Sequence, residues 1–254
     1  MSALLVAAWL LLVYSTKSLQ FFMQTHGLDV LVRAARARLA PGERWLDDAL
    51  AVAGERDINR LLGVYTSASR KSAGRSLSLT ALEHAAIDAL SPGLSCERWA
   101  LEDLVRATIV LAAAREVEEA SAWVATASAC YENGDAREQQ SWLRAMSLLP
   151  VADRFVAFGI DACRSHIQPT FEAIACDNPY PSVHFPDLNF NQLVLKALFI
   201  GVPLARIVGL RRRLNPDLSR MARDYAAERR AAGRAVPVDL ALALHDARIE
   251  EPVS

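Results

Sequence analysis

Apolar residues recur three and four positions apart along most of this 254-residue chain, which is the spacing of one face of an α-helix. The segments 28–39 and 97–115 are clear examples. No run alternates apolar and polar residues for long enough to predict a β-strand. Hydrophobic residues make up 52% of the chain but aromatic residues only 7%, which favours helices rich in alanine and leucine. The sequence therefore predicts an all-α fold, as one elongated domain or two small ones.

The predicted helices are short and follow one another through turns marked by proline or glycine, a pattern typical of helical hairpins. The phrase Glu43-Arg44-Trp45 recurs as Glu97-Arg98-Trp99, 54 residues later. We therefore expect helical hairpins stacked as a degenerate HEAT-like α-α superhelix. A compact helical bundle is the alternative architecture.

Local signals predict where several helices begin, break or end. A capping box, in which a threonine is followed three positions later by a glutamate, predicts a helix over 80–90. Pro169 is expected to kink or split the helix predicted before and after it. The stretch 66–78 is rich in serine, arginine and glycine, so we expect a mobile loop there. Pro203 is expected to open a short helix that continues to Leu210.

Three prolines interrupt the segment 178–187, directly before a strongly apolar stretch. Because proline lacks a backbone N–H and restricts the residue before it, we expect an ordered loop with no helix. A buried helix is predicted next, over 188–201. Lys196 lies within that apolar helix, and its ammonium should either reach water along its own stem or meet a carboxylate.

The chain divides by composition into an apolar extension at 1–27, a helical domain at 28–245 and a polar tail at 246–254. The apolar run at 3–14 is too short for a membrane-spanning helix and lacks the basic start of a signal peptide. Three interpretations stay open. The run is a buried N-terminal helix, a membrane-surface segment, or the product of a start codon placed too early, with Met23 nearer the true beginning.

Long and unusual motifs give the chain, over about 28–245, a resemblance to the EboA family, the namesake of the bacterial ebo gene cluster. The motifs are WLRA (142–145), GIDACR (159–164), NPYP (178–181), FNQLVLKALF (190–199), DYA (224–226) and ERRAAGR (228–234).

The resemblance implies a part in moving a small-molecule metabolite precursor, toward the periplasm. It also implies co-encoded partners, namely a prenyltransferase-like membrane protein of the UbiA type and a TatD-like hydrolase. No catalytic residue is carried over from the family, so the leading hypothesis is a non-catalytic binding or scaffold protein.

Polar side chains around the proline-rich segment form a candidate ligand site beside the buried helix. They come from the predicted helix before the segment, from the segment itself and from the helix after it. These candidate residues are Asp161, Arg164, His166, Glu172, Asn178, Tyr180, His184, Asn191 and Lys196.

An enzyme acting on the same metabolite is the alternative. Its acid, base or metal chemistry would come from Asp161, His166, Glu172, Asp177 and His184. The spacing of these residues matches no metal site, and the chain contains no H-E-x-x-H motif, nucleophile elbow or glycine-rich phosphate loop. The sequence therefore predicts no catalytic residue, no metal and no cofactor.

Charge and cysteine content limit the partners and the compartment. The formal net charge of −1 and the pI of about 6.5 give no basic field for nucleic acid. A basic cluster at Arg229, Arg230 and Arg234 is a candidate partner-binding surface, and it would also suit lipid headgroups in a protein that contacts the membrane peripherally. The four cysteines form no C-x-x-C pair and are expected to be buried thiols in a reducing compartment, which favours the cytoplasm.

Overall fold

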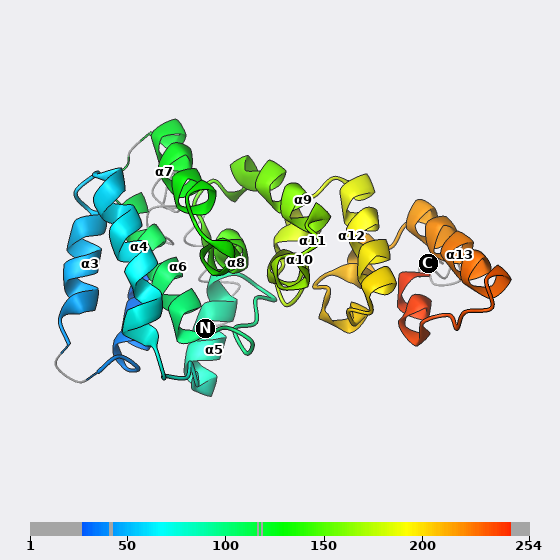
Figure 1. Cartoon of the computed structure of the whole chain (residues 1–254), viewed down its shortest axis with the longest axis horizontal. Coiled ribbons are helices and arrows are strands. Elements are labelled where there is room, and N and C mark those ends of the chain that lie inside the picture. Colours follow the sequence, from blue (N-terminus) through cyan, green and yellow to red (C-terminus); the bar gives the residue numbers. More distant parts are fainter. Residues whose placement is uncertain (1–26, 41–42, 116, 118, 245–254) are drawn as a thin grey trace, which may run out of the picture. The chain divides into compact units, whose positions relative to one another are not determined.

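The computed structural model describes residues 27–40, 43–115, 117 and 119–244. Within these residues helix is the only regular secondary structure, which confirms the predicted all-α class (Figure 1). The chain forms two compact units with their boundary between Phe155 and Val156. The HEAT-like stacking of the hairpins, with a compact bundle as the alternative, stays a prediction. The predictions for the apolar run at 3–14 and for the tail at 246–254 concern residues outside the described ranges.

The first unit is built around one central helix, α6, which contacts α3, α4, α7 and α8. Every residue of α6 except Glu102 and Ala114 is buried. Helical residues 27–36 come first, followed by α3 (Trp45–Ala53), α4 (Ile58–Ser72), α5 (Ala81–Leu90), α6 (Leu101–Ala114), α7 (Ala120–Glu132), α8 (Ala136–Ala145) and the 3₁₀ turns η1 (Met146–Leu148) and η2 (Ala152–Phe155).

Helix α4 extends through most of the stretch predicted to be a mobile loop, so that prediction is wrong. The side chain of Asp57 caps the helix by accepting hydrogen bonds from the N–H groups of the first turn. Tyr65, Ala68 and Ser72 follow at helical spacing and are buried. Their burial against neighbouring helices outweighs the loop-like composition of the segment.

The capping box predicted for the helix over 80–90 is confirmed. The N–H of Glu83 donates to Oγ1 of Thr80 at 3.3 Å, and the N–H of Thr80 donates to Oε2 of Glu83 at 2.7 Å. Arg38 adds a second anchor, because its Nη1 donates to Oε1 of Glu83 at 2.8 Å. The start of α5 is thus held both locally and by a residue 45 positions earlier.

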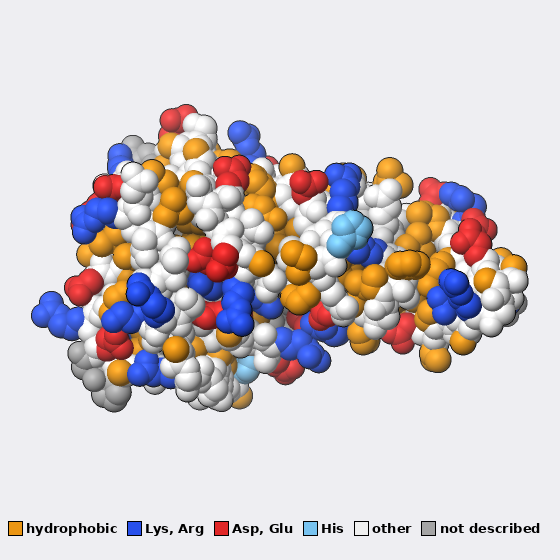
Figure 2. Space-filling view, in the orientation of Figure 1, with side chains coloured by type: hydrophobic (Ala, Val, Ile, Leu, Met, Phe, Trp, Pro, Cys, Tyr) orange, Lys and Arg blue, Asp and Glu red, His pale blue; other side chains and the backbone are white. Residues whose placement is uncertain are grey.

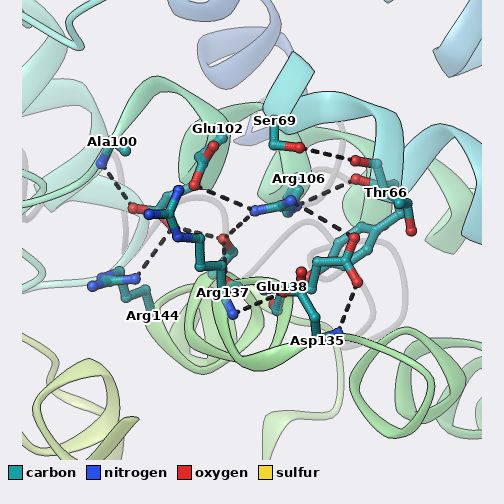
Figure 3. A network of polar contacts seen from close by, with 12 residues as sticks. Thr66, Ser69, Ala100, Glu102, Arg106, Asp135, Arg137, Glu138 and Arg144 are labelled. Carbon is teal, nitrogen blue, oxygen red and sulfur yellow. Dashed lines mark hydrogen bonds and ion pairs between the residues drawn. The ribbon is translucent and has the colours of Figure 1, made fainter. Parts of the chain in front are cut away.

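A buried polar network joins α4, α6 and α8 within the first unit (Figure 3). The side chain of Arg106 on α6 is 2% exposed. Its Nε donates to the carbonyl oxygen of Tyr65 at 3.3 Å, and its Nη1 donates to Oγ of Ser141 at 3.1 Å. The guanidinium also lies over the ring of Tyr65, 5.5 Å from the ring centroid. Arg106 therefore ties the central helix to a neighbour on each side.

Carboxylates balance the charge of Arg106. Oε1 of Glu138 lies 3.7 Å from its Nη2, and Oε1 of Glu102 lies 3.8 Å from its Nη1. Asp103 is also buried; it accepts a hydrogen bond from Oγ of Ser141 at 2.6 Å and pairs with Arg144 at 3.2 Å. A buried charge without a partner is strongly destabilising, so separating α6 from α8 would be costly.

The second unit contains α9 to α13 with three short 3₁₀ segments. In order these are α9 (Val156–Arg164), α10 (Gln168–Ala175), α11 (Tyr180–His184), α12 (Asp187–Ile200), η3 (Leu204–Arg206), η4 (Leu210–Arg213), α13 (Pro216–Ala231) and η5 (Val238–Ala243). Pro169 lies in the first turn of α10, where proline costs no helical hydrogen bond. The prediction of a helix kinked or split near Pro169 is therefore confirmed as a split.

The prediction that no helix occurs in the segment 178–187 is wrong, because α11 forms there. Pro179 is the N-cap of this helix and Pro181 lies in its first turn, positions at which a missing N–H is tolerated. Oδ1 of Asn178 accepts a hydrogen bond from the N–H of Tyr180 at 3.0 Å. The prolines therefore allow one short helix instead of excluding it.

Arg213 closes the other end of α11 from a distant part of the chain. Its guanidinium donates to the carbonyl oxygens of Ser182 and Phe185, at 2.8 Å in each case. The guanidinium also lies 4.7 Å from the centroid of the Phe190 ring. Cationic groups are favourable at helix C-termini, where carbonyl groups lack partners.

Pro203 opens a short helix as predicted, since it is the N-cap of η3, but this helix ends at Arg206 and does not continue to Leu210. Gly209, the N-cap of η4, has φ of +76°, a left-handed backbone conformation that favours glycine. A Cβ atom at this position would lie 2.7 Å from Cβ of Ser182. The chain therefore needs glycine here both for its backbone angle and for its close approach to α11.

Candidate functional site

A pocket of about 850 Å³ lies among α9, α12 and α13, within the second unit. Its surface is mainly apolar, and polar or charged side chains interrupt it. On the face shown in Figure 2, charged groups of both signs lie among hydrophobic side chains over this unit. The apolar lining includes Ile160, Phe185, Leu193, Phe199, Ile200 and Met221.

One face of α12 supplies a wall of the pocket. Asn189, Gln192, Leu193 and Lys196 line it at i, i+3, i+4 and i+7, which is the spacing of one helical face. Phe199 also lines the pocket and is 71% exposed. A large apolar side chain this exposed inside a concave surface is typical of a binding site.

One face of α13 supplies a second wall, formed by Met221, Asp224, Tyr225 and Glu228 at i, i+3, i+4 and i+7. Arg229 orients Tyr225, because its Nη1 donates to the phenol oxygen at 3.2 Å and its guanidinium lies 5.7 Å from the ring centroid. Since the oxygen of Tyr225 accepts this bond, the phenol hydrogen remains a donor.

Lys196 closes the C-terminal end of α9, where its ammonium meets backbone carbonyl oxygens and not the carboxylate of one sequence-based expectation. Its Nζ donates to the carbonyl oxygens of Cys163 and Ser165, at 2.6 Å in each case. It also lies 5.1 Å from the centroid of the Phe171 ring. Burial lowers the pKa of Lys196 because it disfavours the charged form. Lys196 lines the pocket, but its main contacts stabilise the break between α9 and α10.

Two more predicted ligand residues, Arg164 and His166, line the pocket. Both are exposed, at the end of α9 and in the link that follows it. Nη1 of Arg164 lies 3.2 Å from Oδ1 of Asp161, and both side chains of this ion pair are exposed. Asp161 does not line the pocket but lies beside it through Arg164.

Glu172 is engaged in a different cluster and does not line the pocket. Its Oε2 accepts from Nη1 of Arg206 at 2.5 Å, and Oδ2 of Asp177 accepts from Nη2 of the same arginine at 2.7 Å. Burial alone would lower the pKa of Arg206, but the hydrogen bonds to Asp177 and Glu172 outweigh it and raise the pKa. Two carboxylates of the enzyme hypothesis are thus held by one arginine.

Four further candidates form packing and backbone contacts, not the pocket surface. Asn178 is 2% exposed, and its Oδ1 accepts the hydrogen bond from the N–H of Tyr180 at the start of α11. Tyr180 is fully buried, with its ring centroid 4.6 Å from that of His184. Asn191 is 2% exposed and its amide pairs with that of Asn215. The sequence hypothesis therefore mixed pocket-lining and structural polar residues.

The three arginines of the basic cluster at the end of α13 also differ in their surroundings. Arg229 is half-buried against Tyr225, and its Nε also donates to the carbonyl oxygen of Ala235 at 2.6 Å. Arg230 and Arg234 are exposed. Only these two present freely accessible guanidinium groups among the three predicted partner-binding residues.

The cysteines behave as buried thiols. Cys96, Cys130 and Cys176 are buried, and Cys163 is partly buried where it lines the pocket. Burial raises the pKa of Cys96, Cys130 and Cys163 to about 12 in each case. In the described part of the chain, no three His, Cys, Asp or Glu side chains lie close enough to hold a metal ion. Among those same residues, no helix is long and apolar enough to cross a membrane.

The sequence hypothesis missed the α13 wall, although a signal for it was present. Met221, Asp224, Tyr225 and Glu228 share one helical face, and a mixture of methionine, tyrosine and acids on one face is neither a pure core stripe nor a pure solvated face. Gln192 on α12 was missed for a different reason, since an apolar helix of this kind shows no clear polar side.

A family model described as "Metabolite traffic protein EboA" matches residues 34–244 of the chain. That range includes every residue that lines the pocket. Comparisons with curated proteins and with solved structures gave no match. Because the family model covers most of the chain and agrees with the motifs quoted from the sequence, the chain belongs to the EboA family of metabolite traffic proteins.

Proposed function

We propose that this protein is a non-catalytic binding protein that holds a small-molecule metabolite precursor in the pocket of the second unit and assists its transfer or export. The observation that carries the proposal is the pocket itself, about 850 Å³ in volume, mainly apolar and rimmed by a few polar groups. Such a volume and lining suit a drug-sized organic molecule. The exposed ring of Phe199 gives that molecule an apolar surface to cover.

The distribution of titratable side chains favours binding over the enzyme alternative. Of the five residues suggested for acid, base or metal chemistry, only His166 lines the pocket. Glu172 and Asp177 are held by Arg206, and His184 packs on Tyr180. A general base must reach the proton that it removes, and this set does not converge on one point of the pocket.

Transfer requires partners, and the exposed Arg230 and Arg234 at the end of α13 are the surface that we propose for them. The partners are the co-encoded prenyltransferase-like membrane protein and TatD-like hydrolase of the ebo cluster. We place the protein in the cytoplasm, where it meets the membrane through such a partner or peripherally.

The test is to purify the protein from its native cells and identify co-purifying small molecules by mass spectrometry. Gln192→Trp places an indole in the pocket from the exposed side of α12, so the bound molecule should be lost. Leu188→Trp is the matched control, because Leu188 is exposed on the same helix but does not line the pocket. Retention of the molecule in both variants would place binding elsewhere, and partner proteins without any small molecule would indicate a scaffold.

A further inference from the structure

Basic and acidic side chains line separate walls of the pocket. Arg164 and His166 belong to the end of α9 and the link after it, whereas Asp224 and Glu228 belong to α13. Helix α12 joins these walls, because Lys196 bonds to the end of α9 and Asn191 bonds to the N-cap of α13 (Figure 1). The pocket therefore has a basic side and an acidic side.

The charges on both sides are loosely held and can exchange partners. Arg164 and Asp161 form an ion pair whose side chains are 68% and 78% exposed, and such pairs contribute little to stability. Asp224 lies 3.7 Å from Arg220 in a similarly exposed pair. Lys196 differs, since two backbone carbonyl oxygens already accept from its ammonium. Arg164 is thus the cation, and Asp224 with Glu228 the anions, that a ligand can engage.

Between the two sides the pocket presents apolar and aromatic surface. Phe199 is exposed to it, and Tyr225 is held in place by Arg229. Flat apolar groups pack well against such rings. Two cations, Arg164 and Lys196, and two anions, Asp224 and Glu228, line the pocket, so their formal charges cancel. A ligand with a charge of only one sign would meet a repelling wall.

We infer that the pocket takes a dipolar ligand: a body with an aromatic ring, an acidic group directed to Arg164 and His166, and a basic group directed to Asp224 and Glu228. The inference rests on the proposed function, because it names the chemical class of the molecule that the pocket binds. The charged walls would discriminate between ligands of different charge, and the apolar surface between the walls would supply most of the area in contact with the ligand.

The test uses three fluorescent probes that share one aromatic body. Dansylamide is neutral, dansylglycine is anionic and dansylcadaverine is cationic at pH 7. Arg164→Gln should lower the affinity for dansylglycine roughly three- to tenfold, which is the effect of losing one hydrogen bond to a charged group at a solvated site. The affinity for dansylcadaverine should stay within about twofold of the wild-type value. Glu228→Gln should have the opposite pattern. Neither substitution should change the affinity for dansylamide.

Matched controls separate these effects from a change in net charge. Arg223→Gln and Glu132→Gln remove the same charges from exposed positions that do not line the pocket, so both charged probes should bind as to the wild type. The inference is wrong if the two substitutions in the pocket change the affinities of both charged probes equally, or change neither affinity. The charged side chains of the pocket would then contact only solvent. If dansylamide does not bind, or binds Gln192→Trp as tightly as the wild type, the proposed function fails, and the inference fails with it.

Discussion

The side-chain amides of Asn191 and Asn215 pair with each other in both directions. Nδ2 of Asn191 donates to Oδ1 of Asn215 at 3.1 Å, and Nδ2 of Asn215 donates to Oδ1 of Asn191 at 3.0 Å. Oδ1 of Asn215 also accepts from the N–H of Leu218 at 2.8 Å, which makes Asn215 the N-cap of α13. One buried amide on α12 thereby fixes the start of the helix that forms another wall of the pocket.

Asn191→Ala should therefore lower the free energy of unfolding of the second unit. Loss of both amide bonds in a buried position is expected to cost about 1–3 kcal/mol. Urea denaturation followed by circular dichroism measures the change. Asn189→Ala removes the same side chain from a half-buried position two residues earlier and should change stability by less than about 0.5 kcal/mol. Equal effects of the two substitutions would contradict the role given to the amide pair.

Arg106→Met should be among the most destabilising single substitutions in the first unit. It leaves the buried carboxylate of Glu138 without the guanidinium that lies 3.7 Å away, which is expected to cost about 3–5 kcal/mol. Thermal and urea denaturation both report this loss. Arg60→Met is the control, because Arg60 is paired with Glu55 only at the exposed surface, where the change should stay below about 1 kcal/mol. A tolerated Arg106→Met would mean that the network adds no stability.

Gly209 and Gly201 offer a matched comparison, since both have φ of +76°. Alanine at either position is strained in this backbone conformation, by about 1 kcal/mol. At Gly209 the added Cβ would also lie 2.7 Å from Ser182, whereas nothing lies within 4 Å of it at Gly201. We expect Gly209→Ala to cost about 1–3 kcal/mol more than Gly201→Ala in urea denaturation. A cost that is equal at the two positions would show that η4 can move away from α11.

Acid should weaken the contact between Arg38 and Glu83. The hydrogen bond from Arg38 lowers the pKa of Glu83 from 4.5 to about 2. Because the folded pKa lies below the unfolded pKa, the stabilisation is complete above pH 4.5 and is lost as the pH falls toward 2. The stability difference between wild type and Glu83→Gln should therefore be largest near pH 6 and should shrink steadily from pH 4.5 to 2.5.

Urea denaturation of both proteins at several pH values measures this difference. Glu55→Gln, which alters an exposed ion pair with Arg60, should differ from wild type by less than about 1 kcal/mol at every pH. If the difference in the free energy of unfolding between wild type and Glu83→Gln stayed constant from pH 6 to 2.5, the contact between Arg38 and ionised Glu83 would not be its cause.

The thiols of Cys96, Cys130 and Cys163 should resist alkylation in the native protein. With a pKa raised to about 12 by burial, roughly one thiol in ten thousand is a thiolate at pH 8. Iodoacetamide should modify these three residues at least a hundredfold more slowly than free cysteine, as followed by peptide mass spectrometry. The same residues should react fully in urea. Rapid native modification of Cys163 alone would indicate that the pocket opens more widely around this thiol than the structure shows.

Helix boundaries set by local contacts were predictable from the sequence. Thr80 and Glu83 form their capping box within three residues, so this motif alone identifies the start of α5. The stretch 66–78 misled the prediction because burial of Ala68 and Ser72 depends on helices that pack from elsewhere in the chain. Composition cannot report such tertiary burial.

The candidate site shows the same limit. Of the predicted ligand residues, Arg164, His166 and Lys196 line one pocket, because the first two lie at the junction after α9 and Lys196 reaches that junction from α12. Asn178 and Asn191 were chosen as polar residues next to an apolar helix, yet both satisfy neighbouring backbone or amide groups. A buried polar residue and a ligand-facing one have the same sequence signature, and only the packing distinguishes them.

The ammonium of Lys196 has a consequence for how the second unit assembles. It closes the end of α9 by reaching back 33 and 31 positions to Cys163 and Ser165. During synthesis, α9 and α10 leave the ribosome before their junction has this partner, because the chain grows from its N-terminus. Each helix can wind early through its own hydrogen bonds, but the basic wall of the pocket takes its final form only once α12 has docked. The pocket is therefore among the last parts of this unit to mature.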